Sequence, residues 1–136
     1  MRRRTIVVMS VVILATIAGA IALARRSASE SRPTDASLLR NLGDEYDNGG
    51  LFQFFWNTRG KNNDLTLMAL ERLNDRRYAD VFRKAVAEFN AEWSQMAAAW
   101  GSFDKTMDVA TYSAAVAQSA IPALDREWAA LPPISP

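Results

Sequence analysis

The stretch NGGLFQFFWNTRG, residues 48–60, predicts a helix that is almost entirely buried. At about 100° per residue its large apolar side chains cover an arc of roughly 200°, and Gln53 and Asn57 share the remaining side. The apolar residues are Leu51, Phe52, Phe54, Phe55 and Trp56. We expect them to form the core, because large aromatic residues at helical spacing usually serve packing. Glycines at both ends let the chain enter and leave this helix sharply.

The amides of Gln53 and Asn57 have two interpretations. In the first, they satisfy backbone groups of neighbouring turns and are part of the core structure. In the second, they lie at the rim of a pocket or of a surface that binds a partner. If the protein is instead a small enzyme that uses carboxylates or amides, its site is expected near Gln53 and Asn57.

Helical patterns continue on both sides of this stretch. Asp35 is placed to cap a helix that ends before Gly49, and Asp64 to cap a helix over residues 65–73. No run of residues alternates apolar with polar side chains in the way that a half-buried strand does. The sequence therefore predicts an all-α fold.

The strongest periodicity begins at Tyr78 and predicts a long amphipathic helix, with Trp93 in the core, that reaches Trp100 before Gly101 ends it. Two more helices are expected over residues 107–118 and 123–130. Residues 35–131 would then form a small single-domain bundle of about five helices, followed by a tail over residues 132–136.

The amino-terminal part predicts a membrane anchor over residues 1–26. Thr5 to Ala24 is a run of 20 residues without a charge, long enough to cross the hydrocarbon core as a helix. Positive charge is in excess on the amino-terminal side of this run, so we expect a cytoplasmic amino terminus in the bacterial inner membrane and a periplasmic or extracellular domain. The alternative is a signal peptide cleaved after Ala22-Leu23-Ala24, which would leave a secreted protein. Residues 27–34 are interpreted as a linker.

The composition beyond residue 26 disfavours several functions. It holds 11 basic and 15 acidic residues, a net charge of −4, without the basic patch that direct nucleic-acid binding needs. The chain lacks cysteine, and it lacks histidine, the commonest general base and transition-metal ligand. Asp44, Glu45 and Asp47 cluster without the spacing of a calcium loop. We expect no cofactor, no metal and no catalytic residue.

Two motifs resemble those of the bacterial all-helical domain family typified by the nineteen-kilodalton DNA-mimic protein. The first is the family's N-G-G-aromatic-x-Q-aromatic-x-x-N-x-x-G stretch, with Leu51 where an aromatic residue is usual, and its positions here are Asn48, Gly49, Gly50, Gln53, Phe54, Asn57 and Gly60. The second is a closing Leu-Asp-x-x-aromatic segment, here Leu124, Asp125 and Trp128. We interpret all of these positions as structural. For Asp125 the roles considered are a surface charge and a partner for a backbone amide in the core.

The resemblance implies an all-α fold and, in the member that names the family, a dimer whose acidic surface imitates DNA and occupies a transcription factor. A mimic needs dense negative charge, and a net charge of −4 beyond residue 26 is low for that purpose. Export would also separate this domain from cytoplasmic DNA-binding proteins. We therefore expect a membrane-anchored, non-catalytic domain that binds another protein, with a homodimer left open. The alternatives are a DNA-mimic-type regulator or inhibitor of a DNA-binding protein, and the small enzyme named above.

Overall fold

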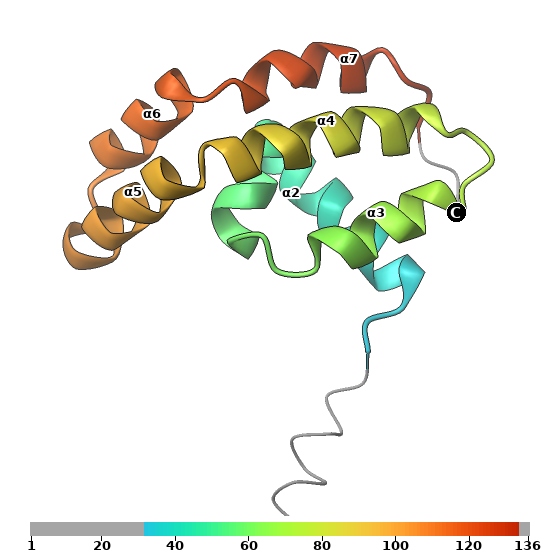
Figure 1. Cartoon of the computed structure of the whole chain (residues 1–136), viewed down its shortest axis with the longest axis horizontal. Coiled ribbons are helices and arrows are strands. Elements are labelled where there is room, and N and C mark those ends of the chain that lie inside the picture. Colours follow the sequence, from blue (N-terminus) through green and yellow to red (C-terminus); the bar gives the residue numbers. More distant parts are fainter. Residues whose placement is uncertain (1–31, 134–136) are drawn as a thin grey trace, which may run out of the picture. The chain divides into compact units, whose positions relative to one another are not determined.

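The computed structural model describes residues 32–133, and its regular structure is helical throughout (Figure 1). This confirms the predicted all-α class for the described part of the chain. The elements in order are α2 (Asp35–Thr58), α3 (Asn63–Glu71), α4 (Arg77–Ala91), α5 (Trp93–Thr106), α6 (Val109–Gln118), the 3₁₀ helix η1 (Ile121–Leu124) and α7 (Asp125–Ala129).

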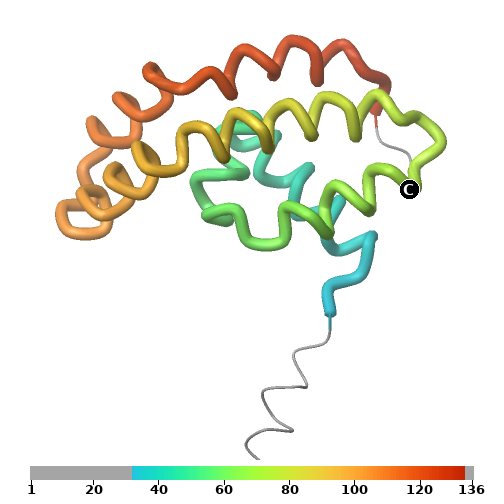
Figure 2. Tube along the Cα trace, viewed as in Figure 1, coloured from blue at the N-terminus to red at the C-terminus, as the bar shows by residue number. Residues whose placement is uncertain are grey.

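The helices from α4 onward form a long return path. α4 and α5 follow one another in nearly the same direction, and the chain then turns back through α6, η1 and α7 (Figure 2). On this return α6 contacts α5, and α7 contacts α4. α2 and α3 pack on the remaining side, where α3 contacts both α2 and α4. The two ends of the domain meet, because η1 contacts both α2 and α4.

Helix α2 is interrupted where the sequence predicts a break. Gly49 has an extended φ of −179°, and Gly50 has φ 78° and ψ −171°, so the backbone is not helical at either residue. We refer to residues 35–48 as the first segment of α2 and to residues 51–58 as its second segment. The predicted boundary between two helices at these glycines is confirmed.

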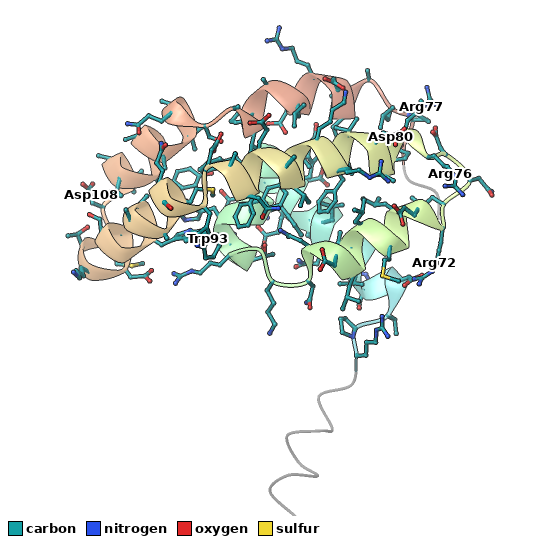
Figure 3. All side chains as sticks on the ribbon, viewed as in Figure 1. Arg72, Arg76, Arg77, Asp80, Trp93 and Asp108 are labelled. Carbon is teal, nitrogen blue, oxygen red and sulfur yellow. The ribbon has the colours of Figure 1, made fainter. Side chains whose placement is uncertain are left out.

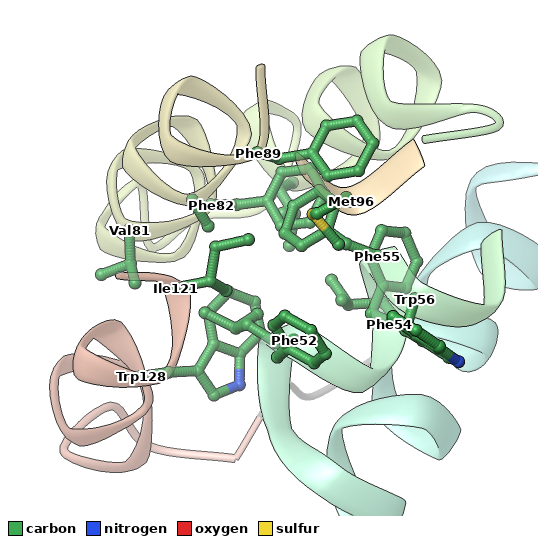
Figure 4. Packing of buried hydrophobic residues seen from close by; sticks show 14 of the residues in the cluster. Phe52, Phe54, Phe55, Trp56, Val81, Phe82, Phe89, Met96, Ile121 and Trp128 are labelled. Carbon is green, nitrogen blue, oxygen red and sulfur yellow. The ribbon is translucent and has the colours of Figure 1, made fainter. Parts of the chain in front are cut away.

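The second segment of α2 lies at the centre of the core, as predicted (Figure 4). Phe52, Phe54 and Phe55 are each at most 1% exposed. The Phe55 ring stacks on Phe82 and on Phe89 of α4, with ring centroids 5.7 and 4.9 Å away. Such pairs add roughly 0.5–1.5 kcal/mol beyond the area that they bury. The stretch quoted first is thus the element on which the other helices assemble.

Both predicted helix caps were wrong by one or two residues. Thr34, in an extended conformation, caps α2 through Oγ1, which accepts from the Ser37 amide at 3.2 Å. Asp35 lies inside the helix and forms an ion pair with Arg72 at 2.7 Å. Helix α3 begins after Asn62, which is left-handed and makes no capping hydrogen bond through its side chain. At α2 the cap is the residue whose backbone is extended, and the tertiary path of the chain decides which residue that is.

The long amphipathic helix was also predicted wrongly, because it is two helices with a bend at Glu92. The Glu92 backbone leaves the helical region (φ −90°, ψ 1°), and its carboxylate accepts from the Ala120 amide at 2.7 Å. The bend leaves Trp93 46% exposed instead of in the core. Gly101 does not end the helix either, because α5 continues to Thr106 and Met107 turns left-handed. The last predicted helix begins as η1 and becomes α7 at Asp125.

No helix within residues 32–133 combines the length and the apolar character that crossing a membrane requires. The predicted anchor, Thr5 to Ala24, lies outside the described residues.

Candidate functional site

The two family-like motifs meet at the break in α2. The Leu51 amide, at the start of the second segment, donates to Asp125 Oδ1 at 2.9 Å. Tyr46 Oη donates to the backbone oxygen of Asp125 at 3.2 Å. Of the two roles considered for Asp125, the structure shows the amide partner, and its negative charge faces a helix amino terminus, where it is favourable. Burial raises the pKa of Asp125, and the hydrogen bond from Leu51 opposes this rise.

Gly50 is the residue that lets Asp125 approach. Its φ of 78° and ψ of −171° lie in a region that is essentially restricted to glycine. A Cβ atom on Gly50 would also lie 2.8 Å from Asp125 Cγ. Gly60 likewise lets the Phe89 ring approach the backbone, because its φ is 75° and a Cβ there would lie 2.7 Å from that ring. These two glycines of the motif serve close packing.

The amides of Gln53 and Asn57 point to different partners. Gln53, half-buried, accepts from Tyr112 Oη at 2.5 Å through Oε1. Asn57 is exposed, and its Nδ2 donates to Glu45 Oε2 at 2.7 Å. Among the described residues both therefore bind side chains, and the predicted hydrogen bonds to backbone groups of neighbouring turns are not made. The fold brings Tyr112 of α6 within reach of Gln53. The break in α2 brings Glu45 of its first segment within reach of Asn57.

The remaining motif positions range from core to surface. Phe54 is buried and Asn48 is exposed. Leu124 is half-buried and packs against the core. Trp128 is 7% exposed, and its ring lies 5.7 Å from Tyr46 and 5.3 Å from Tyr78.

An apolar groove lies beside this junction, between the first segment of α2 and the chain after α7. Its volume is about 780 Å³. We call it the α2–α7 groove. Apolar and aromatic side chains dominate its floor, and Arg40, Asp44 and Asp47 stand at its edge. Its floor and walls include Ala36, Leu39, Gly43, Tyr46, Leu73, Tyr78, Trp128, Leu131 and Pro132.

Tyr78 is the polar group in the floor of the groove. Its side chain is only 4% exposed, and Oη has no hydrogen-bond partner among the described residues. Burial raises the pKa of Tyr78, and the nearby charge of Asp75 adds to the rise, so the hydroxyl stays protonated at neutral pH. A buried hydroxyl without a partner costs roughly 1–3 kcal/mol. The groove is therefore lined by a tyrosine whose hydroxyl is buried and has no partner among the described residues.

Six carboxylates of the described residues form ion pairs, and those at the edge of the groove do not. At the turn between α3 and α4, where Figure 3 shows Arg72, Arg76, Arg77 and Asp80 gathered, arginines alternate with acids. The ion pairs are Arg59–Asp104, Arg72–Asp35, Arg77–Asp75, Arg83 with Glu71 and Asp80, and Lys84–Glu127. Within residues 32–133, Asp44, Glu45 and Asp47 form no ion pair. No group of three or more acidic residues in that range is arranged to hold a metal ion.

Comparison with protein families identifies the chain. The family model described as DMP19-like protein matches residues 33–134. The chain belongs to the DMP19-like protein family. The comparisons with curated proteins and with solved structures found no match.

The family match confirms the resemblance inferred from the two motifs. All ten motif positions lie inside the matched residues, and so do all the residues that line the α2–α7 groove. In this DMP19-like domain the motifs build the junction between the two ends of the chain, and the groove opens next to it.

Sequence reasoning found the motif positions of the DMP19-like domain but missed its groove. The walls of the groove come from α2, from the turn before α4 and from the chain after α7, which lie far apart in the sequence. A partial signal was present, since Leu131-Pro132-Pro133 is an apolar, rigid ending after Trp128. Only the packing of α7 against α2 and α4 places that ending opposite the first segment of α2.

Proposed function

We propose that this DMP19-like domain works by binding another protein through the α2–α7 groove. The observation that carries the proposal is an apolar groove of about 780 Å³ with Arg40, Asp44 and Asp47 among its lining residues. An apolar centre with a charged edge is the usual composition of a protein interface. Grooves of this kind accept the apolar face of an amphipathic segment.

The charges at the edge indicate the chemistry of the partner. Asp44 and Asp47 line the groove without an ion pair among the described residues, and Glu45 stands between them on the same helix. Arg40 supplies one opposing charge. In a partner segment that fits, an apolar stripe would pack on the floor of the groove, and flanking lysine or arginine residues would pair with the carboxylates at its edge. An acidic segment would be repelled.

The DNA-mimic alternative receives less support from the charge arrangement. A mimic must present negative potential without interruption to a surface that binds phosphates. Here six carboxylates pair with arginine or lysine, so positive charges interrupt the negative ones on the surface. The enzyme alternative receives less support as well, because a solid core of aromatic rings lies beneath the helix that carries Gln53 and Asn57.

We further propose that the domain is held at the membrane by the segment Thr5 to Ala24, with the domain on the periplasmic or extracellular side. The support is the length and apolar character of that segment and the three arginines that precede it. Reporters active only in the periplasm or only in the cytoplasm, fused after Pro136, test this in intact cells. A cytoplasmic signal would contradict it and would return the search to cytoplasmic DNA-binding proteins.

Photo-crosslinking in living cells tests the groove. A photoreactive phenylalanine analogue in place of Ala36, which lines the groove and is exposed, should couple to a partner protein. The same analogue in place of Ala98, exposed on α5 and outside the groove, should not. Gly43→Trp should abolish the crosslink by filling the groove, since no atom lies within 4 Å of a Cβ added there.

The matched control is Gly101→Trp, at a helical glycine with equally open surroundings on α5. It should leave the crosslink from position 36 intact. The coupled segment of the partner should carry apolar residues and at least one lysine or arginine. A crosslink that survives Gly43→Trp, or a coupled segment that is acidic, would overturn the proposal.

A further inference from the structure

A second cleft lies on another part of the domain, between the start of α3 and the junction of α4 with α5. Its volume is about 630 Å³. We call it the Trp93 cleft. It shares no lining residue with the α2–α7 groove, and its composition differs, because amides and charged groups alternate with apolar ones. Its lining is Arg59, Gly60, Asn62, Asn63, Asp64, Leu65, Val86, Phe89, Asn90 and Trp93.

Trp93 supplies a firmly held aromatic surface at the side of the cleft. It lies at the junction of α4 and α5, where Figure 3 labels it, and it is 46% exposed. Its ring meets Phe89 and Trp100 edge to face, with centroids 5.5 and 5.6 Å away. Both of these partners are buried. The indole is therefore supported by the core while nearly half of the residue remains open to solvent.

Asn63 supplies a buried polar group in the same cleft. The residue is 8% exposed, and its Oδ1 has no hydrogen-bond donor among the described residues. Asn62 beside it is left-handed at φ 66° and makes no capping bond with its side chain. A buried amide oxygen without a donor is unfavourable by roughly 1–3 kcal/mol. The Asn63 Oδ1 atom is itself buried, so it lies behind the surface of the cleft.

We propose that the Trp93 cleft binds a carbohydrate. The apolar face of a sugar ring packs on an exposed indole, and its hydroxyls both donate and accept. They match the Asn90 amide, which also does both, and the Arg59 N–H groups other than those of Nη2, which binds Asp104. A phosphate group fits less well because Asp64 lies in the lining and Arg59 already pairs with Asp104 at 2.7 Å. A purely apolar ligand would leave the amides without partners.

The test uses the full chain and three named probes: a neutral glucan oligomer, maltohexaose; a chitin oligomer, chitohexaose; and an acidic oligomer, hexagalacturonate. Each is titrated to millimolar concentration while the indole N–H signals are followed by NMR. We expect at least one probe to move the Trp93 signal and to leave that of Trp128, which lines the other groove, in place.

Two variants of the cleft and one control accompany the titration. Trp93→Ala should weaken binding of the active probe by about tenfold or more, and Asn90→Ala, at an exposed position, should weaken it without disturbing the fold. Met68→Ala removes another exposed apolar side chain outside the cleft and should leave binding unchanged. Failure of all three probes to move the Trp93 signal, or equal binding by Trp93→Ala, would overturn the proposal.

Discussion

Gly50 and Asp125 form the contact on which the two family motifs depend. The carboxylate of Asp125 accepts from the Leu51 amide at 2.9 Å, and it reaches that amide because Gly50 has no side chain. The same glycine holds a backbone conformation that other residues adopt only with strain. Gly50 thus meets a steric and a conformational requirement at once. Asp125 provides the hydrogen-bond acceptor for the amide at the start of the second segment of α2.

Gly50→Ala should destabilise the domain strongly. The strained backbone alone costs roughly 1–3 kcal/mol, and the overlap with Asp125 adds to it. Urea denaturation of the full chain measures the loss. Gly101→Ala is the control, because Gly101 lies in helix α5 with open space around it. That change should be neutral or stabilise the domain by up to about 1 kcal/mol; equal losses for both variants would contradict the role assigned to Gly50.

The titration of Asp125 should appear as a dependence of stability on pH. Burial places the pKa of Asp125 in the folded state above its ordinary value, so the folded state holds the proton more tightly than the unfolded state does. Stability contributed by the protonated form is therefore lost as the pH rises from about 4 through the folded-state pKa. Asparagine does not titrate and keeps an oxygen that can accept from Leu51.

Asp125→Asn should accordingly gain stability relative to the native chain as the pH is raised. The measurement is the difference between the two free energies of unfolding at pH 3.5 and at pH 7, since contributions from other carboxylates cancel in that difference. A gap that stays constant between the two pH values would show that the pKa of Asp125 is the same in the folded and unfolded states, which would contradict the prediction.

Helix α6 buries few of its residues, and Tyr112 links it to α2. Ala115 is its single buried residue. Tyr112 binds Gln53 through its hydroxyl, and its ring lies edge to face against Phe52 and Trp56, with centroids 5.7 and 5.0 Å away. By contrast, α4 buries six residues. Helices with few buried apolar contacts open at lower free energy than the global unfolding reaction.

Tyr112→Ala should therefore speed the exchange of backbone amides in α6 while those in α4 keep their protection. Native-state hydrogen exchange followed by NMR or mass spectrometry resolves the two helices. Ser113→Ala, at the exposed neighbouring position, is the control and should leave both helices as they were. Equal acceleration in α4 would mean that α6 opens only together with the whole domain.

The beginning and the end of the domain are held together by aromatic packing around Trp128. Its ring contacts Tyr46 on the first segment of α2 and Tyr78 on α4, so α7 is joined to two elements that come much earlier in the chain. The α2–α7 groove exists because of this closure. Stability of the domain and the shape of its proposed binding site therefore depend on the same contacts.

Trp128→Ala should lower the free energy of unfolding by about 3–5 kcal/mol, the usual loss for a buried tryptophan. Trp93→Ala is the matched control, since that side chain is 46% exposed, and it should cost far less. Denaturant midpoints and slopes measured by circular dichroism compare the two. A large loss for Trp93→Ala would assign that residue to the core, as the sequence first suggested.

Local patterns were sufficient to predict the all-α class, the buried stretch from Leu51 to Trp56 and the break at Gly49-Gly50. Each of these depends on neighbours within a few turns, through helical periodicity or through the φ angles open to glycine. Mixed residue types at set intervals were also enough to recognise the DMP19-like family. The anchor and the exported location stay predictions, because they concern residues outside the described range.

The remaining features arise from contacts between distant segments. Asp125 stands 74 residues from the amide that it caps, and Glu92 breaks a continuous helical pattern by binding an amide 28 residues further along. Trp93 follows the periodicity of α4 yet turns outward after that bend. The groove and the Trp93 cleft each combine side chains from several helices. Periodicity reports which face of one helix is apolar, whereas the position of that face against other helices depends on how all of them pack, and this is a property of the folded chain as a whole.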